Sequence, residues 1–286
     1  MATTSSPLPE SQRSCERLSS RSSVLDRPIR ELCLAAIDFE TTGLSPRRGD
    51  RVIEAAVVRG KLGEIPGEWS RLVNPERPVA ATFVHGITDE MVASEPTFRQ
   101  IAPEFLAQLD GTVLIAHNAP FDLGFLEMEC ERAGIVWKAP FVIDSLGLSR
   151  RVLAWGRHGL GHLAERFGLP GANAHRARDD ARATWLLTGI LVKTVSEAGE
   201  ICLGDLLRLC QRRSARENDE IYAALHRART GGAHLLVDYV SADRPGAATR
   251  RSITVLKVTR RECEAFCHLR GAQRTFRLDR LRIVEV

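Results

Sequence analysis

The sequence has no apolar run that approaches the roughly 18 residues a helix needs to span a bilayer. Its N-terminal residues also lack the apolar core of a secretory signal, so we expect a cytoplasmic protein that does not enter a membrane. Residues 1–28 are rich in Ser and Arg and show no hydrophobic periodicity, which predicts a disordered arm. An organellar transit peptide is the alternative, and Glu10, Glu16 and Asp26 argue against it.

Paired cysteines are also missing. The seven cysteines are an odd number and include no CxxC pair, which argues against a disulfide framework and against a zinc ribbon. We expect most of these thiols to be small, buried hydrophobic side chains.

The chain does have length and an uneven charge distribution. Its 286 residues, 44% of them hydrophobic, are enough for one domain of about 150 to 200 residues and a smaller one. From Asp205 to the C-terminus, 17 Lys and Arg stand against 10 Asp and Glu, whereas the whole chain carries a net charge of only +4. A basic second part fits an acidic partner such as a nucleic acid, although arginine-rich surfaces are common without one.

Strand and helix patterns mix between residues 32 and 195. Apolar runs predict four strands, at 32–39, 51–60, 68–75 and 111–118. Helical spacing predicts four helices, at 97–109, 120–134, 160–170 and 177–199. This order predicts an α/β domain with a mixed sheet flanked by helices.

The rest of the chain predicts a smaller, β-rich domain. Residues 199–217 are polar and are expected to form a linking helix or loop, and residues 221–232 a helix that ends in glycines. Four strand-like runs follow, at 234–240, 250–258, 263–269 and 274–286. A small β-barrel or sandwich is the expected architecture.

Two carboxylates stand where the first buried strand ends. Asp38 and Glu40 are two residues apart, and residues i and i+2 of a strand point to the same side. Two like charges so close repel each other unless a cation lies between them, and ligand sets made only of oxygen favour Mg²⁺ or Mn²⁺ over zinc. The alternative is a strand that has simply reached solvent.

Further acids and one histidine fit the same site. Asp122 lies just inside the helix that follows a buried strand, an edge where α/β sheets place active sites. His175 precedes the long helix, and Asp179 and Asp180 lie in its first turns. Each is unremarkable alone, because acids at a helix start complement its dipole. As a set, acids from separate elements and one histidine suit two-metal phosphodiester hydrolysis.

The motifs also resemble a known family. The order "DFETTG", "HGIT", "AHNAPFD" and "HRARDDA" is similar to the DEDD superfamily of 3′–5′ exonucleases, in its histidine-containing (DEDDh) branch. That branch includes the DnaQ-like, polymerase III epsilon-type proofreading subunits of bacterial replicative DNA polymerase. The resemblance covers roughly residues 32–195 and implies a ribonuclease H-like fold.

The resemblance implies a role for each motif residue. It implies metal ligation of two divalent cations, Mg²⁺ or Mn²⁺, by four acids: Asp38, Glu40, Asp122 and Asp180. It implies that His175 is the general base, which takes a proton from the attacking water. Asp179 does not match, because the motif places its acid five positions after the histidine. The residues implied to hold the terminal nucleotide are Thr41, the backbone near Thr42, Phe121 and Phe125, with plain core as the alternative for Phe125.

Other polar residues near the motifs have weaker signals. His85, and His117 with Asn118, match positions of the family, and we expect them to shape the fold and the rim of the pocket. His158, His162 and Asp144 are expected to be solvated or capping residues, with support of the site as the alternative for Asp144.

The C-terminal region resembles a WYL-type domain, a small Sm-like barrel of bacterial regulators and nucleic-acid enzymes. Its ending, "CHLRGAQRTFRLDRLRIVEV", carries the resemblance, whereas residues 261–263 are Arg, Glu and Cys in place of Trp, Tyr and Leu. That departure argues against the usual ligand-sensing role. By strand alternation, one face collects Arg274, Phe276, Leu278 and Arg280. Such a face could bind single-stranded nucleic acid, or be a barrel wall with arginines that reach solvent.

We therefore predict a disordered arm (1–28), a DEDDh exonuclease domain (29–198), a linker (199–217) and a WYL-like domain (218–286). The predicted reaction releases nucleoside 5′-monophosphates from the 3′ ends of single-stranded DNA or RNA. A DNA polymerase or a repair complex is the predicted protein partner. The alternative is a nucleic-acid-binding or ligand-sensing regulator that uses the nuclease fold only to recognise a 3′ end.

Overall fold

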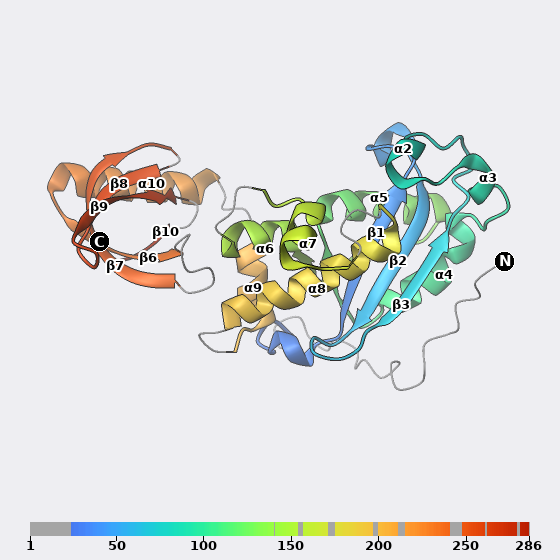
Figure 1. The fold of residues 1–286 in the computed structure, drawn as a ribbon, viewed down its shortest axis with the longest axis horizontal. Helices are drawn as coiled ribbons and strands as arrows, with labels where there is room; N and C mark the ends of the chain where they lie inside the picture. Colours follow the sequence, from blue (N-terminus) through green and yellow to red (C-terminus); the bar gives the residue numbers. More distant parts are fainter. Residues whose placement is uncertain are drawn as a thin grey trace. The chain divides into compact units, whose positions relative to one another are not determined.

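The computed structural model describes residues 24–139, 141–153, 157–170, 175–196, 200–210, 215–240, 248–260, 262–278 and 281–285. The described chain forms two compact units (Figure 1). The first is built from the described parts of 1–148, 157–192 and 201–210, and the second from those of 149–156, 193–200 and 211–286. Within the described residues, no helix has the length and apolar character that crossing a membrane would require.

The first unit contains a mixed five-stranded sheet. Its strands are β1 (Leu34–Thr41), β2 (Val52–Gly60), β3 (Gly67–Leu72), β4 (Val113–Ala116) and β5 (Val142–Asp144). The order is β3-β2-β1-β4-β5, in which β1 pairs with β2 and β2 with β3 antiparallel, whereas β4 pairs with β1 and with β5 in parallel. This sheet confirms the predicted mixed α/β class.

Helices flank the sheet. They are η2 (Ile29–Glu31), η3 (Pro46–Arg48), α2 (Thr82–His85), α3 (Asp89–Val92), α4 (Phe98–Leu109), α5 (Ala119–Ala133), α6 (Ser145–Val152), α7 (Leu160–Phe167), α8 (Ala177–Ser196) and α9 (Leu203–Cys210). Local sequence explains several helix ends. Thr97 and Gln100 form a capping box at the start of α4, and Gly134 ends α5 with a φ of 75°.

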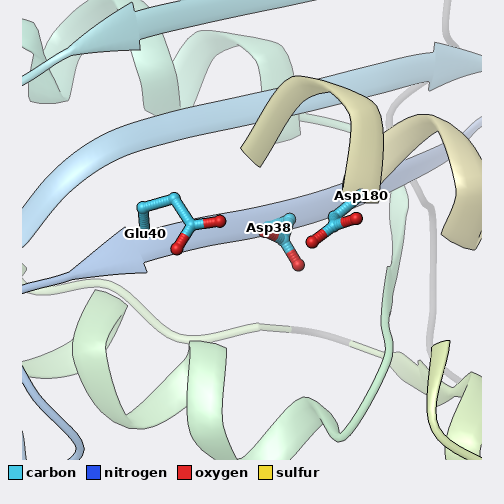
Figure 2. Close-up of side chains that lie close together, drawn as sticks. All are labelled: Asp38, Glu40 and Asp180. Carbon is cyan, nitrogen blue, oxygen red and sulfur yellow. The ribbon is translucent and has the colours of Figure 1, made fainter. Parts of the chain in front are cut away.

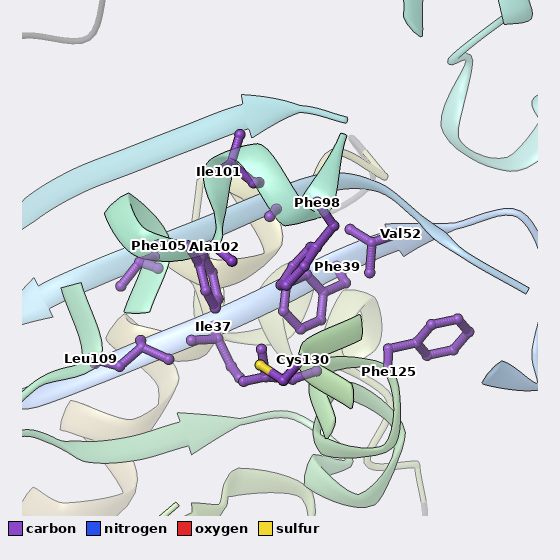
Figure 3. Packing of buried hydrophobic residues seen from close by; sticks show 14 of the residues in the cluster. Ile37, Phe39, Val52, Phe98, Ile101, Ala102, Phe105, Leu109, Phe125 and Cys130 are labelled. Atoms are coloured by element: carbon purple, nitrogen blue, oxygen red, sulfur yellow. The ribbon is translucent and has the colours of Figure 1, made fainter. Parts of the chain in front are cut away.

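The hydrophobic core lies between one face of the sheet and helices α4 and α5. Phe39 of β1 contacts Phe105 of α4 with ring centroids 5.5 Å apart, and Phe98 and Phe105 lie 6.0 Å apart (Figure 3). Ile37 and Phe39 belong to this core. Because side chains alternate along a strand, Asp38 and Glu40 face the other side of β1, the side that α8 contacts.

Both ends of the first unit differ from the sequence-based boundaries. The predicted disordered arm includes residues 24–28, yet Val24 is buried and Pro28 forms a β-bridge with Cys202. The predicted linker includes residues 201–210, yet they belong to the first unit, where the Ile29 N–H donates to the Ile201 carbonyl at 3.1 Å. Residues 1–23 lie outside the described chain.

The second unit is a helix followed by an antiparallel sheet. It contains α10 (Ala215–Gly231), β6 (His234–Val240), β7 (Ala248–Val258), β8 (Glu262–Cys267), β9 (Ala272–Arg277) and β10 (Leu281–Glu285), with the strand order β10-β6-β7-β8-β9. The expected small β-rich domain is confirmed, but the run 274–286 is not one strand, because it divides between β9 and β10. Leu225 and Ala228 of α10 pack against the sheet.

The prediction that the face with Phe276 and Leu278 binds nucleic acid is wrong. Phe276 and Leu278 are buried in its core, where the Phe276 ring contacts that of Tyr239 with centroids 4.9 Å apart. Arg274 is exposed at the edge strand β9, and Arg280 lies outside the described residues. Phe276 therefore cannot stack on bases, and the alternative, a wall of the domain core, applies to Phe276 and Leu278.

Candidate active site

Three of the predicted acids converge at one point. Asp38 and Glu40 project from β1, and Asp180 projects from the first turn of α8 (Figure 2). One carboxylate oxygen from each lies within 4.8 Å of the other two. Three carboxylates at this spacing form an oxygen-only ligand set of the kind that suits Mg²⁺ or Mn²⁺.

Asp122 completes the set of acids but is placed differently. It lies in the first turn of α5, is buried, and is not a member of the close group of three. The backbone of Phe39 and of Asp122 itself lowers the pKa of this carboxyl group, against the larger effect of burial, and its charge raises the pKa of Asp38. Helix α5 therefore brings Asp122 close to Asp38 on strand β1.

Burial raises the pKa of all four acids, and the charges of neighbouring acids raise it further. Burial, followed by the charges of Asp122 and Asp180, raises the pKa of Asp38 well above its usual range. Burial is also the main reason why the pKa rises to about 8 for Asp122, to about 7 for Glu40 and to about 6 for Asp180. Such a site holds protons near neutral pH, and a divalent cation would displace them by stabilising the charged form.

His175 lies beside this cluster. It is exposed, lies two residues before the first residue of α8, and its charge lowers the pKa of Asp180. Its backbone is in the left-handed region, with a φ of 40°, which is uncommon for a residue other than glycine. Asp179 also affects Asp180 electrostatically but is not part of the close group of acids.

The two threonines implied to hold the substrate shape the loop after β1. The Thr41 hydroxyl donates to the Gly43 carbonyl at 2.7 Å, and the Thr42 hydroxyl accepts from the Arg51 N–H at 3.0 Å. Thr42 is only 2% exposed, so its side chain is not free to touch a nucleotide. Contact through Thr41 and through the backbone near Thr42 stays a prediction.

The two phenylalanines of α5 have different surroundings. Phe125 is fully buried in the core cluster, which corrects its placement at the nucleotide in favour of the plain core alternative. Phe121 is half-buried at the edge of that cluster, with its ring centroid 5.0 Å from that of Phe125. Its predicted substrate contact remains a prediction.

The histidines expected to shape the fold do make internal hydrogen bonds. His85 is buried, accepts the Ile87 N–H at Nδ1 (3.1 Å) and lies 3.2 Å from the Ala80 carbonyl at Nε2. Burial lowers its pKa, as expected for a neutral ring. His117 lies 2.9 Å from the Ser145 hydroxyl and 2.8 Å from the His158 carbonyl. His162 is exposed.

Asp144 supports the helix that carries Asp122. Its Oδ1 accepts hydrogen bonds from the backbone N–H groups of Asn118 (3.1 Å), Ala119 (3.3 Å) and Leu146 (3.2 Å). Two of these groups belong to the start of α5, whose first N–H groups have no partner within the helix. The capping role expected for Asp144 is therefore observed, and it bears on the position of Asp122.

Glu54 and Arg176 are two residues near the site that were not predicted from the sequence. Arg176 follows His175, and both of its contacting nitrogens donate to the carboxylate of Glu54, on β2. A signal was present, because Glu54 is a single acid within the apolar run "VIEAAVV".

Comparisons with known proteins are consistent with this geometry. Residues 35–188 match the RNase_T family model, which is described as "Exonuclease". The PolC-type DNA polymerase III of Staphylococcus epidermidis is 33% identical over 215 residues, which are 74% of this chain and 14% of that protein. The corresponding protein of Staphylococcus haemolyticus is 36% identical over 177 residues, 61% of this chain and 12% of that protein. The chain thus spans only 12% to 14% of the length of these relatives.

Solved exonuclease structures share the fold. An exonuclease I from Methylocaldum szegediense matches with a TM-score of 0.51 and 20% identity. The match covers 82% of this chain and 54% of that chain. The zinc-bound complex of E. coli exonuclease I with single-stranded DNA has the same TM-score and coverage at 18% identity. At this identity the likeness concerns the fold alone, and it confirms the ribonuclease H-like fold predicted for the first unit.

Proposed function

Because this chain belongs to the RNase_T family of exonucleases, and is of the DEDDh type that its motifs predicted, we propose that it acts on the 3′ ends of single-stranded DNA or RNA and releases nucleoside 5′-monophosphates. The proposed cofactors are two divalent cations, Mg²⁺ or Mn²⁺. The observation that carries the proposal is the convergence of Asp38, Glu40 and Asp180 within 4.8 Å.

Each residue has a proposed task. Asp38, Glu40 and Asp180 hold the cations, together with Asp122 on the α5 side of the site. Bound divalent cations lower the pKa of a water molecule and stabilise the attacking and leaving oxygens of an in-line displacement. His175, exposed beside Asp180, accepts the proton of that water.

The choice of substrate is supported by the relatives. The E. coli exonuclease I structure contains single-stranded DNA, and the PolC-type relatives are DNA polymerases. Single-stranded DNA is therefore the first substrate to test, with RNA as the second. The polymerase relatives also support the proposal of a DNA polymerase as partner, with a repair complex as the alternative.

The test is a cleavage assay with labelled oligonucleotides. Single-stranded DNA and RNA, each with a free or a blocked 3′ end, are incubated with Mg²⁺ or Mn²⁺ and the wild type, Asp38→Asn or Asp179→Asn. We expect shortening only from free 3′ ends, a loss of at least about a thousandfold for Asp38→Asn, and near wild-type rates for the neighbouring-acid control Asp179→Asn.

Two outcomes would contradict the proposal. One is that neither oligonucleotide shortens with either cation, and the other is that Asp38→Asn works as well as the wild type. Binding of 3′ ends without shortening would favour the regulatory alternative. The complete set of four acids and a histidine in this sequence argues against that alternative.

We propose that the second unit binds nucleic acid through a face other than the one predicted. Across β6, β7 and β8, the register aligns His234 with Thr254 and Thr254 with Phe266. Phe266 is 38% exposed and its ring centroid lies 5.3 Å from that of His268, which is also exposed. Exposed rings on a basic domain can stack on the bases of a single strand. The WYL-type identity of this unit and a cytoplasmic location of the protein also belong to the proposal.

A further inference from the structure

We infer that Glu54 and Arg176 form a clamp that positions His175 and Asp180 in the active site. The clamp joins the acids of β1, through β2, to the start of α8. The inference rests on the proposed function and adds two positioning residues to it, neither of which is proposed to touch a cation or the substrate.

The clamp is a two-point ion pair with a buried carboxylate and a partly exposed arginine. Arg176 Nε donates to Glu54 Oε2 at 2.9 Å, and Arg176 Nη2 donates to Glu54 Oε1 at 2.7 Å. The Ala177 N–H also donates to Glu54 Oε2, at 3.0 Å. Glu54 is only 3% exposed, and both of its oxygens are engaged. A guanidinium held at two points by a carboxylate is fixed in orientation as well as in distance.

One end of the clamp is tied to the metal-binding strand. Glu54 on β2 is the direct partner of Glu40 on β1 in the antiparallel register. Partners in such a register point to the same side of the sheet, where two like charges destabilise the pair. Arg176 offsets this repulsion, because its charge lowers the pKa of Glu40 whereas that of Glu54 raises it.

The other end of the clamp holds the segment that carries the histidine and the fourth acid. Arg176 separates His175, with its φ of 40°, from the first residue of α8. A residue other than glycine persists in that backbone region only where its surroundings enforce it. The Arg176 carbonyl also accepts the Asp180 N–H at 3.0 Å. A clamp on Arg176 and Ala177 therefore fixes both the turn at His175 and the helical turn that ends at Asp180.

The chain offers a matched control for this clamp. Glu129 of α5 is 1% exposed, accepts from Arg51 at 2.7 and 3.1 Å, and accepts the Val52 N–H at 3.3 Å. Like Glu54, it is a buried acid bound by an arginine fork and a backbone N–H, and Arg132 also donates to it at 3.2 Å. The hydrogen bonds of Glu129 go to Arg51, Val52 and Arg132 and not to the segment 175–180, so Glu129→Gln measures the general cost of breaking such a pair.

The first test compares Glu54→Gln, Arg176→Gln, the double variant and Glu129→Gln in steady-state cleavage and thermal unfolding. We expect kcat to fall about 30- to 100-fold in both single variants, with KM for the oligonucleotide within about threefold, because a small displacement of reacting groups has that effect. The double variant should lose no more than the worse single variant, since the two residues act as one unit. Glu129→Gln should lower Tm by a similar amount and keep its kcat.

The double variant guards against a failure to fold, because it does not leave the charge of Arg176 or of the buried Glu54 without its partner. Wild-type kcat in folded Glu54→Gln, or an equal loss of kcat in Glu129→Gln, would overturn the clamp.

The second test does not depend on activity. Amide hydrogen exchange should be about tenfold faster for the N–H groups of residues 177–180 in Glu54→Gln than in the wild type, and unchanged there in Glu129→Gln. If the wild type cleaves nothing, the proposed function fails while this measurement still decides the clamp. Unchanged exchange at 177–180 in Glu54→Gln would show that Glu54 does not hold this segment.

Discussion

At the scale of single residues, the candidate site is a set of acids that the fold forces together. Their pKa values rise to about 6 for Asp180, about 7 for Glu40 and about 8 for Asp122, with burial as the main cause. An unfolded chain would ionise the same groups near pH 4. Between these limits the folded protein binds more protons than the unfolded one, so its stability falls as pH rises.

This difference predicts a pH dependence that a cation reverses. In EDTA, Tm of the wild type should fall from pH 5 to pH 8 more steeply than Tm of Glu40→Gln, which lacks one of the titrating groups. Mg²⁺ or Mn²⁺ should raise Tm more at pH 8 than at pH 5, because the cation binds the ionised form. Thermal scans over this range provide the measurement. Parallel curves for wild type and variant would contradict the raised pKa values.

A second residue-scale prediction concerns His175. His175→Gln should lower kcat about a hundredfold at neutral pH, the size expected for the loss of a general base. Mn²⁺ affinity and KM should stay close to wild type, because His175 is not among the proposed ligands. His162→Gln is the control, since His162 is also exposed but lies on α7. Single-turnover cleavage measures the effect, and an unchanged rate in His175→Gln would remove it from the mechanism.

The sequence was sufficient for some residues of the site and not for others. The two-residue step of a strand predicted that Asp38 and Glu40 share a side, and the motif spacing added Asp180, which the geometry of the three acids matches. The pairing of Glu54 with Arg176 could not be predicted, because 122 positions separate them and no local periodicity relates residues so far apart. Thr42 and Phe125 carry a family-like pattern, but only packing reveals that their side chains are buried.

At the scale of secondary-structure elements, the position of Asp122 depends on how α5 begins. Asp144→Ala removes the acceptor of three backbone N–H groups, two of them at the start of α5. We expect a loss of about 1 to 2 kcal/mol in the free energy of unfolding. Asp144→Asn keeps an acceptor oxygen at Oδ1 and should lose less. Urea unfolding of both variants measures the difference, and equal stability of wild type and Asp144→Ala would contradict the cap.

Strand patterns have a limit that the second unit illustrates. Alternation correctly placed Phe276 and Leu278 on one face, but it does not say whether that face meets the core or solvent. The answer depends on α10, which covers the face through Leu225 and Ala228. Arg274 shares their alternation and lies on the same strand as Phe276, yet it stays exposed.

At the scale of the whole molecule, the sequence predicted two domains from a change in pattern and charge. It did not predict that residues 201–210 return to the first unit. That return includes contacts between residues more than 170 positions apart, such as the Leu203 N–H with the Arg27 carbonyl at 3.0 Å. A polar stretch between two domains resembles a linker whether or not part of it packs, so composition alone could not separate the cases.

The charge asymmetry leads to the last prediction, which concerns the second unit. Sixteen of the 17 Lys and Arg counted after residue 205 follow residue 210, so a chain that ends at residue 210 loses most of the basic region. It keeps all residues of the first unit. With Asp38→Asn present to prevent cleavage, we expect this shortened chain to bind labelled single-stranded DNA more weakly. The dependence of log affinity on log salt concentration should also be shallower, because fewer cationic side chains displace counterions from phosphates.

Without Asp38→Asn, the kcat of the shortened chain at saturating substrate should stay within about threefold of wild type, since the active site is intact. Removal of residues 1–23 is the control for shortening the chain, because that segment holds three Arg and two Glu. Fluorescence anisotropy over a salt series measures both quantities. If affinity and salt slope are the same with and without residues 211–286, the second unit does not hold the nucleic acid and its basic character serves another purpose.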